Sequence, residues 1–357
     1  MRSRLAITLS VLAGVLLAPG MWAIPAAGSA RSSGERAAVP GPGAGASAVA
    51  EALSARIRAS AASDSKRDCV YSANSERVLA RFEALVHRRI NCVEVYDNES
   101  QTWAEWAHPW FLNDQPGYAW ATWATAAAGR QLVFDQSLIP TRLAHTAWRA
   151  ACARGAFVSD ARALARNLVA AGLSHSIIRL AGEMNGTWNI DNVGESPRQM
   201  REWAACWRRT VLAMRHVPGA TFTIDFSINA AVRPLALRTF YPGNRTVDII
   251  GIDAYDQGIG PGPNRWESIY DRPDGIGAVL SFARSHHKPL SIPEWGLAGA
   301  RDGDGGGDDP AYVRGIADIV RGDDVAYQSY FFNHGFATEL ARDQRSLRLY
   351  RTLFGAG

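Results

Sequence analysis

Two glutamates in this chain, Glu183 and Glu294, each come at the end of an aliphatic run and close to a tryptophan. Glu183 follows "IIRLAG", and Glu294 follows "PLSIP". A pair of carboxylates can divide the work of an acid and a base: one donates a proton while the other attacks as a nucleophile or activates water. A single glutamate at a strand end more simply caps a helix or pairs with an arginine. The interpretation therefore depends on whether the fold brings the two together.

Eight short apolar runs predict the strands that position these glutamates. Several are rich in β-branched residues and are bounded by Gly, Pro or Asn, as is typical of buried parallel strands. The predicted strands span residues 69–72, 91–96, 131–135, 176–180, 221–226, 248–252, 289–292 and 326–330. Segments with helical spacing of apolar residues lie between them, at 75–89, 159–172, 196–216 and 275–287. Ser159 is a plausible cap for the second of these, and Gly172 a plausible stop.

The alternation of strand and helix predicts an α/β fold with a parallel sheet. Eight strands suit a closed (β/α)8 TIM barrel that forms a single catalytic domain. The alternative is an open doubly wound sheet, which usually has a glycine-rich turn after its first strand. The corresponding turn here reads "SANSE", which favours the barrel.

In such a barrel, reactive groups lie just beyond the C-terminal ends of the strands. Glu183 follows the fourth predicted strand and Glu294 follows the seventh, so both side chains would reach the same rim. Two carboxylates converging there suit glycoside hydrolysis, with roughly 5 Å between them for retention and roughly 6.5–9.5 Å for inversion. Asp135, Asn229 and Asp253 also follow strands and are weaker candidates for the cleft.

Three motifs give the chain a family resemblance. The stretch "RLAGEMNGTW" resembles the acid/base motif of glycoside hydrolase family 26, in clan A of the glycosidases. Its matching positions are Arg179, Glu183, Asn185, Gly186 and Trp188. "DIIGIDAYD" and "SIPEWG" resemble the sixth and seventh strands of that family. The resemblance covers roughly residues 69–354.

The resemblance implies roles for individual residues. Glu183 would be the general acid and then the base, Glu294 the nucleophile, and Tyr255 a hydrogen-bond donor that orients Glu294. The remaining expected substrate-binding residues are Asp135, Arg179, Asn185, Trp188 and Trp295. Each has a simpler reading: a capping or loop role for Asp135, a structural ion pair for Arg179, a turn for Asn185, and core packing for the two tryptophans.

The chain departs from the family pattern at two places. The His that normally precedes the acid/base is Gly182 here, which removes a donor and should leave space where the cut sugar lies. The eighth strand often ends in a tryptophan, and here "YFFNHG" places Phe331, Phe332 and Asn333 there. The five tryptophans in the loop after the second strand are too many for one loop to bury, so one or two are candidates for outer sugar subsites. They are Trp103, Trp106, Trp110, Trp120 and Trp123.

The N-terminal segment predicts export. Residues 1–30 have a charged start, an apolar stretch and small residues, as in a cleaved signal peptide, with an uncleaved anchor or an unrelated apolar start as the alternatives. Residues 31–64 are rich in Ala, Gly, Pro and Ser and predict a disordered linker, so the barrel domain would span 65–357. An oxidising destination permits disulfides. Of the three possible pairings, the local pairs Cys69–Cys92 and Cys152–Cys206 are the expected ones, with buried free thiols as the alternative.

Composition limits the possible partners. The net charge of the whole chain is only +4, and no basic run is present, so we expect no nucleic-acid partner. We likewise expect no metal, no cofactor and no membrane contact after signal cleavage, and a monomer that binds a polysaccharide substrate.

The sequence thus predicts a secreted retaining glycoside hydrolase that cleaves a β-linked polysaccharide, with β-mannan first among substrates. Three alternatives stay open within enzymes: β-glucan, β-1,3-xylan or an envelope polysaccharide. A non-catalytic polysaccharide-binding barrel is the alternative from another class, although binding alone needs neither glutamate.

Overall fold

The structure is a computed structural model that describes residues 68–97, 100–230, 236–258, 262, 264–299, 305–333 and 340–355. The predicted signal peptide (1–30) and linker (31–64) lie outside the described residues. The first strand, β1, begins at Asp68. None of the described helices is both long enough and apolar enough to cross a bilayer.

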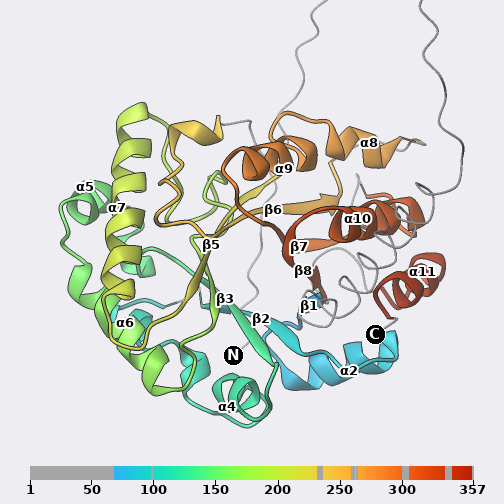
Figure 1. Ribbon diagram of the computed structural model, residues 1–357, viewed down its shortest axis with the longest axis horizontal. Helices are drawn as coiled ribbons and strands as arrows, with labels where there is room; N and C mark the ends of the chain where they lie inside the picture. Colours follow the sequence, from blue (N-terminus) through green and yellow to red (C-terminus); the bar gives the residue numbers. More distant parts are fainter. Residues whose placement is uncertain are drawn as a thin grey trace, which may run out of the picture. The chain divides into compact units, whose positions relative to one another are not determined.

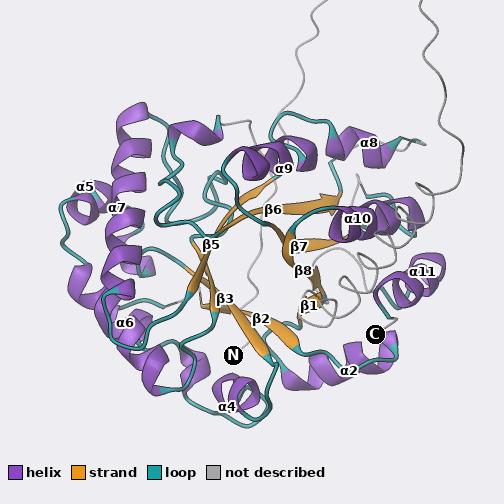
Figure 2. Ribbon diagram, viewed as in Figure 1, coloured by secondary structure: helices purple, strands orange, loops and turns teal. Residues whose placement is uncertain are grey.

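The eight strands form one closed parallel barrel in which each strand pairs with its sequence neighbours and β1 pairs with β8. Figures 1 and 2 show the ring of strands with the helices around it. The strands are β1 (Asp68–Tyr71), β2 (Cys92–Asp97), β3 (Gln131–Gln136), β4 (Ile177–Leu180), β5 (Thr223–Asn229), β6 (Ile249–Asp256), β7 (Leu290–Leu297) and β8 (Val325–Phe331). The predicted (β/α)8 barrel and all eight predicted strands are confirmed.

A helix or a 3₁₀ turn lies between each pair of successive strands, in the crossovers that parallel pairing requires. The α-helices are α2 (Glu76–Val86), α3 (Trp103–Ala107), α4 (Trp120–Thr125), α5 (Trp148–Ala153), α6 (Val158–Ala170), α7 (Pro197–Arg215), α8 (Arg265–Tyr270), α9 (Ile276–Ser285), α10 (Pro310–Gly322) and α11 (Gln344–Phe354). Short 3₁₀ turns are η2 (Trp110–Leu112), η3 (Thr141–Leu143) and η4 (Leu237–Thr239). The four predicted helices correspond to α2, α6, α7 and α9.

The ends of two helices test the capping predictions. The N-cap of α6 is Phe157 and not Ser159, which lies inside the first turn, so that prediction is wrong. Gly172 is confirmed as the stop, since it lies just beyond the end of α6 with a φ of +78°. Helix α7 begins with a capping box in which the side chains of Ser196 and Gln199 each accept the other's backbone N–H.

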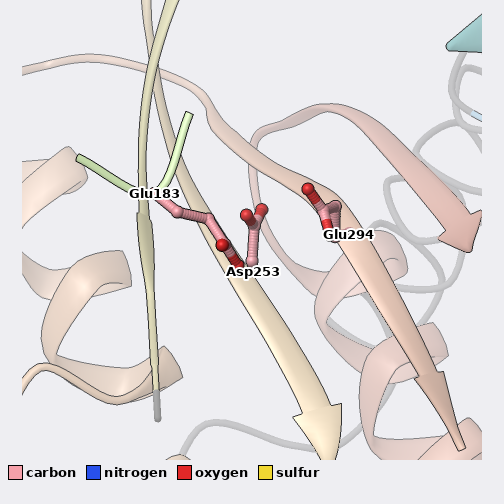
Figure 3. A group of neighbouring side chains, drawn as sticks. All are labelled: Glu183, Asp253 and Glu294. Carbon is pink, nitrogen blue, oxygen red and sulfur yellow. The ribbon is translucent and has the colours of Figure 1, made fainter. Parts of the chain in front are cut away.

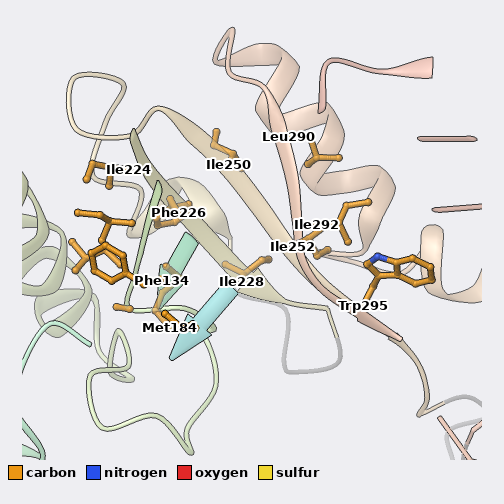
Figure 4. Packing of buried hydrophobic residues seen from close by; sticks show 14 of the residues in the cluster. Phe134, Met184, Ile224, Phe226, Ile228, Ile250, Ile252, Leu290, Ile292 and Trp295 are labelled. Atoms are coloured by element: carbon orange, nitrogen blue, oxygen red, sulfur yellow. The ribbon is translucent and has the colours of Figure 1, made fainter. Parts of the chain in front are cut away.

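The apolar core is a layer between the strands and the helices. It takes the outward-facing residues of the strands together with the buried faces of the helices, and Figure 4 shows part of it around β5, β6 and β7. A separate small cluster, from five different strands, comprises Cys69, Cys92, Val133, Ile249 and Tyr327. Other side chains that the strands bury are polar or charged, among them Glu94, Arg179 and Asp225. Groups of this kind can take part in chemistry at the C-terminal rim.

Both expected disulfides are confirmed. Cys69 and Cys92 are register partners on β1 and β2, with Cα atoms 4.4 Å apart. Cys152 on α5 and Cys206 on α7 have Cα atoms 4.9 Å apart. No free cysteine is present among the described residues. The first bridge links neighbouring strands, and the second ties two helices of the outer layer together.

Candidate active site

Arg179 is the centre of the barrel's polar interior. It lies in β4, is completely buried, and forms salt bridges with four acids contributed by four other strands. These acids are Glu94 on β2, Asp135 on β3, Asp253 on β6 and Glu294 on β7. Parallel strands of a barrel aim alternate side chains inward, and residues of similar height from different strands meet there. The result is one guanidinium shared among several carboxylates.

Glu294 is held by three neighbours. Arg179 Nη1 lies 2.5 Å from its Oε1, and the Tyr255 hydroxyl donates to its Oε2 at 2.7 Å. Burial opposes ionisation of Glu294. The charge of Arg179 and hydrogen bonds from Tyr96, Tyr255 and Arg179 outweigh that effect, so the pKa of Glu294 is lowered. Glu294 is therefore an ionised carboxylate with both oxygens oriented.

The strand that carries Glu294 is irregular at that residue. The pairing of β7 with β8 shifts between Ile292 and Trp295, and its pairing with β6 shifts between Gly251 and Ala254. Such irregularities re-aim side chains beside active sites. The predicted strand ended at residue 292, whereas β7 continues to Leu297. Glu294 therefore lies within the strand and not after it.

Glu183 stands on the loop after β4 in an unusual backbone conformation. Its φ is +54°, and Ala181 has a φ of +50°, a region that costs free energy for residues other than glycine. Asn229 donates from Nδ2 to Glu183 Oε1, and Trp188 Nε1 donates to Oε2 at 2.8 Å. Desolvation by burial and the charge of Glu294 raise the pKa of Glu183 despite Arg179 and these two hydrogen bonds.

The two glutamates are close together. One carboxylate oxygen from each of Glu183, Asp253 and Glu294 lies within 4.8 Å of the other two, and Figure 3 shows the three side chains side by side. Groups of this kind can hold a metal ion. Here Arg179 already lies against Asp253 and Glu294, so the positive charge that balances these carboxylates comes from the protein.

The opposite shifts of the two pKa values suit a pair with different roles. Glu183 tends to keep its proton while Glu294 tends to lose its own. Two titratable groups whose environments separate their pKa values in this way can serve as acid and nucleophile in the same reaction.

A cavity of about 580 Å³ opens beside Glu294 on the side of β8, β1 and β2. It is lined by Tyr71, Asn74, Tyr96, Trp110, Gln115, Tyr118, Glu294 and Phe331. Five of these eight residues are aromatic, as in a site that binds the apolar faces of sugar rings. Of the five tryptophans singled out in the loop after β2, Trp110 lines this cavity, whereas Trp106 and Trp120 are buried.

Several expected site residues do meet in this region. Tyr255 contacts Glu294, and Trp188 contacts Glu183 while leaving 56% of its surface exposed. Asp135 lies beside Arg179 with its side chain 10% exposed. These placements agree with a role at the cleft.

Three expectations about substrate contact are wrong. Trp295 is completely buried on the outer face of β7, where its Nε1 bonds Gln328 and its ring packs on Tyr330. Arg179 is equally inaccessible, so its contact is with Glu294 and not with substrate.

Asn185 is the third residue for which the expected contact with substrate is wrong. It is 2% exposed, and its amide exchanges two hydrogen bonds of 2.9 Å with the backbone of Asn229. These bonds hold the loop after β4 against the end of β5. Asn185 thereby positions Asn229, whose own side chain donates to Glu183.

Other residues of the site were missed. Glu94 and Tyr96 lie inside the run "CVEVYD", where the apolar character hid them. An acid inside a buried strand is rare unless it is paired, and this was the available signal for Glu94. For Tyr71, the sequence offered no indication of a role at the site other than its place at the end of β1.

Comparison with known proteins finds a family match for the part of the chain that carries Glu183. Residues 154–275, which include Glu183, Asp253 and Tyr255, match the family model for "Glycosyl hydrolase family 26". This match spans about a third of the chain and marks it as a divergent relative of glycosyl hydrolase family 26. It is accordingly a glycoside hydrolase. No curated protein matches the chain in sequence.

Solved structures share the fold of this chain at low identity. A Cellulomonas fimi endo-β-1,4-mannanase double mutant is 15% identical, with a TM-score of 0.56 over 81% of this chain and 70% of that chain. The β-mannanase BoMan26A from Bacteroides ovatus is 12% identical, with a TM-score of 0.54 over 84% and 93%. The YdhT protein from Bacillus subtilis is 13% identical, with a TM-score of 0.56 over 80% and 84%. At these identities the likeness establishes the barrel alone.

Proposed function

We propose that this enzyme is a retaining glycoside hydrolase of β-linked polysaccharides, with β-mannan first among its substrates. The observation that carries the proposal is the spacing of Glu183 and Glu294, whose nearest carboxylate oxygens lie within 4.8 Å. Retaining glycosidases hold the two groups about 5–5.5 Å apart, because the nucleophile attacks the sugar directly and no water stands between them.

In the proposed reaction, Glu183 donates its proton to the glycosidic oxygen while Glu294 attacks the anomeric carbon. The glycosidic bond breaks and a covalent glycosyl-enzyme forms on the Glu294 carboxylate. Glu183, now ionised, takes a proton from a water molecule that attacks the same carbon and releases Glu294. The charge of Glu294 helps to raise the pKa of Glu183, so loss of that charge in the first step would lower this pKa and favour the ionised Glu183 that acts as the base in the second step.

The surrounding residues support these roles. Tyr255 and Arg179 orient and stabilise the ionised Glu294. Asn229 and Trp188 hold the Glu183 carboxyl group in position. The aromatic cavity beside Glu294 would bind the sugars on the side of the attacked ring, and the exposed Trp188 ring would contact sugars near the leaving group.

Support for mannan comes from the family. Solved structures with the same barrel include β-mannanases from Cellulomonas fimi and Bacteroides ovatus. Support for secretion comes from the signal-like residues 1–30 and from two disulfides, which persist mainly in oxidising compartments.

The test is a polysaccharide panel with the purified full chain and the variants Glu183→Gln and Glu294→Gln. The panel contains β-mannan, glucomannan, β-glucan, β-1,3-xylan and envelope polysaccharide, and the readout is new reducing ends. We expect mannan to be cleaved best and each variant to lose on the order of 10³-fold or more in kcat. Glu195→Gln, an exposed position at the start of the α7 cap, is the matched control.

Proton NMR of the first product then distinguishes retention from inversion. Release of the β-anomer from a β-linked substrate supports the proposed mechanism, and release of the α-anomer refutes it. Gln variants as active as the wild type would refute the assignment of both glutamates. Cleavage of another glycan in preference to mannan would overturn the substrate alone.

A further inference from the structure

Gly182, directly before Glu183, occupies a space that admits no side chain. A Cβ atom built on Gly182 would lie 2.1 Å from Asp135 Oδ2 and 2.7 Å from both Nε and Cζ of Arg179. The backbone of Gly182 is not in the left-handed region, so glycine is needed here for space and not for conformation. The expectation that Gly182 leaves an open space is therefore wrong, because the Asp135 carboxylate and Arg179 fill it.

Asp135 differs from the other acids around Arg179 in its access to the cleft. The side chains of Glu94 and Asp253 are completely buried, whereas those of Asp135 and Glu294 are each 10% exposed. Asp135 and Glu294 also approach the same nitrogen, Arg179 Nη1, at 3.5 Å and 2.5 Å. Asp135 is thus the one acid of this group, besides the nucleophile, whose carboxylate can meet a bound sugar.

We propose that Asp135 is a specificity-determining residue whose carboxylate, held in the space beside Gly182, hydrogen-bonds a ring hydroxyl of the sugar that Glu294 attacks. This inference rests on the proposed function and adds a recognition group to it. A carboxylate accepts hydrogen bonds from hydroxyls in a fixed direction, so it distinguishes an axial from an equatorial hydroxyl. An epimer that cannot reach Asp135 would leave a largely buried acceptor without that bond, which is the situation that gives strong discrimination.

The test compares Asp135→Asn and Asp135→Ala with the wild type on epimeric substrates. Aryl β-glycosides with manno, gluco and galacto rings at the cut position differ from one to the next in the orientation of single hydroxyls. We expect the ratio of kcat/KM between the best epimer and its partner to fall at least tenfold in both variants. Asp318→Asn, an exposed position on α10, should leave the ratio unchanged.

A purely structural role for Asp135 predicts a different result. In that case all epimers lose activity by the same factor, the ratio stays at its wild-type value, and the inference is overturned. The ratio is a suitable readout because a general weakening of the Arg179 network cannot move it.

Gly182→Ala tests the same contact from its other side. The added methyl group must displace the Asp135 carboxylate, so the ratio should shift in the same direction as in Asp135→Ala. The double variant Asp135→Ala/Gly182→Ala should show no further shift, because both changes remove one interaction. A Gly182→Ala enzyme with the wild-type ratio would contradict the inference.

The two proposals fail in separable ways. Glu183→Gln and Glu294→Gln variants that remain active refute the proposed function whatever Asp135 does. Inactive Gln variants together with an unchanged epimer ratio in both Asp135 variants refute only the inference about Asp135.

Discussion

The inside of this barrel and the layer around it differ in the side chains that they bury: charged groups lie inside, and large aromatic rings lie outside. The interior near the C-terminal rim holds a buried arginine and four acids that pair with it. The layer outside the strands holds most of the large aromatic residues, and six tryptophans there are almost completely buried. Charged residues are seldom fully buried, and tryptophan often keeps some exposure. The buried charges of the interior are explained by the active site that they form. The buried tryptophans of the outer layer are explained by their packing between strands and helices.

The aromatic layer supports the rim on which the site is built. The indole nitrogens of Trp106, Trp110, Trp120 and Trp203 each donate to a backbone carbonyl of a loop that follows a strand or of a strand end. Buried tryptophans need such partners for their N–H groups. The abundance of tryptophan in the sequence thus reflects the anchoring of loops more than the binding of sugars, and Trp188 is the strongly exposed exception among the described residues.

The largest expected effect comes from the centre of the interior. Arg179→Lys keeps the charge but loses the planar fork that contacts several carboxylates at once. We expect kcat to fall on the order of 10³-fold, because the Glu294 carboxylate loses its orientation and part of its stabilisation. The measurement is steady-state kinetics on the best polysaccharide, with Arg198→Lys on the exposed face of α7 as control. A loss of less than tenfold would show that Arg179 is a structural ion pair alone.

A substitution in the outer layer should affect stability first. Trp295→Ala removes a buried ring that packs between Tyr330, Tyr350 and Phe354. We expect a loss of about 3–5 kcal/mol in the free energy of unfolding, measured by urea titration. KM should stay at the wild-type value below the unfolding transition, because the ring does not reach the cleft. A variant of wild-type stability with a raised KM would contradict the assignment of Trp295 to the core.

The exposed Trp188 should show the opposite pattern. Trp188→Ala removes a ring that is 56% exposed and donates to Glu183 Oε2. We expect kcat/KM to fall roughly 10–100-fold, which corresponds to about 1–3 kcal/mol of stacking and hydrogen bonding. The free energy of unfolding should change by less than about 0.5 kcal/mol, as for other surface positions. If stability fell as far as in Trp295→Ala, the contrast between the two tryptophans would not hold.

The smallest expected effect is a pH dependence that originates in the interior. Burial raises the pKa of Glu94 to about 8, and that of Asp135 to about 7, against the pull of Arg179 in both cases. The folded state therefore keeps protons that the unfolded state releases, so stability falls as pH rises from about 4.5 towards 8. Each such proton contributes a slope on the order of 1 kcal/mol per pH unit.

Glu94→Gln tests this origin, since the amide resembles the protonated acid. We expect the slope of unfolding free energy between pH 5.5 and 7.5 to become shallower by about one proton. Urea titrations at three pH values measure it, and Glu195→Gln is the exposed control. A variant with the wild-type slope would show that Glu94 carries no proton in this range.

Much of the fold and the identity of the two central glutamates followed from local sequence patterns. Apolar runs bounded by turn residues predicted all eight strands, and the spacing of apolar residues predicted four of the helices that lie between them. Glu183 and Glu294 were recognisable because a barrel presents the ends of its strands at one rim. The cysteine pairs were predictable because each joins cysteines that are neighbours along the sequence, with separations of 23 and 54 residues.

The direction of individual side chains was decided by the tertiary structure. Glu294 and Trp295 are adjacent in sequence, yet one faces the cleft and the other the core. Its place in the motif predicted that Asn185 binds sugar, whereas its amide bonds the backbone of Asn229. A strand places successive residues on opposite faces, and a local irregularity changes where each one points, so composition near a motif does not reveal which face a residue occupies.

The sequence by itself determined which residues could do chemistry and in what order the strands present them, because those properties depend on local patterns along the chain. Only the tertiary structure decided that Arg179 joins four acids from four other strands, and that Asp135 fills the space beside Gly182. Those contacts join residues up to 115 positions apart. They depend on barrel register and on the volume left between side chains, which no single segment of the sequence encodes.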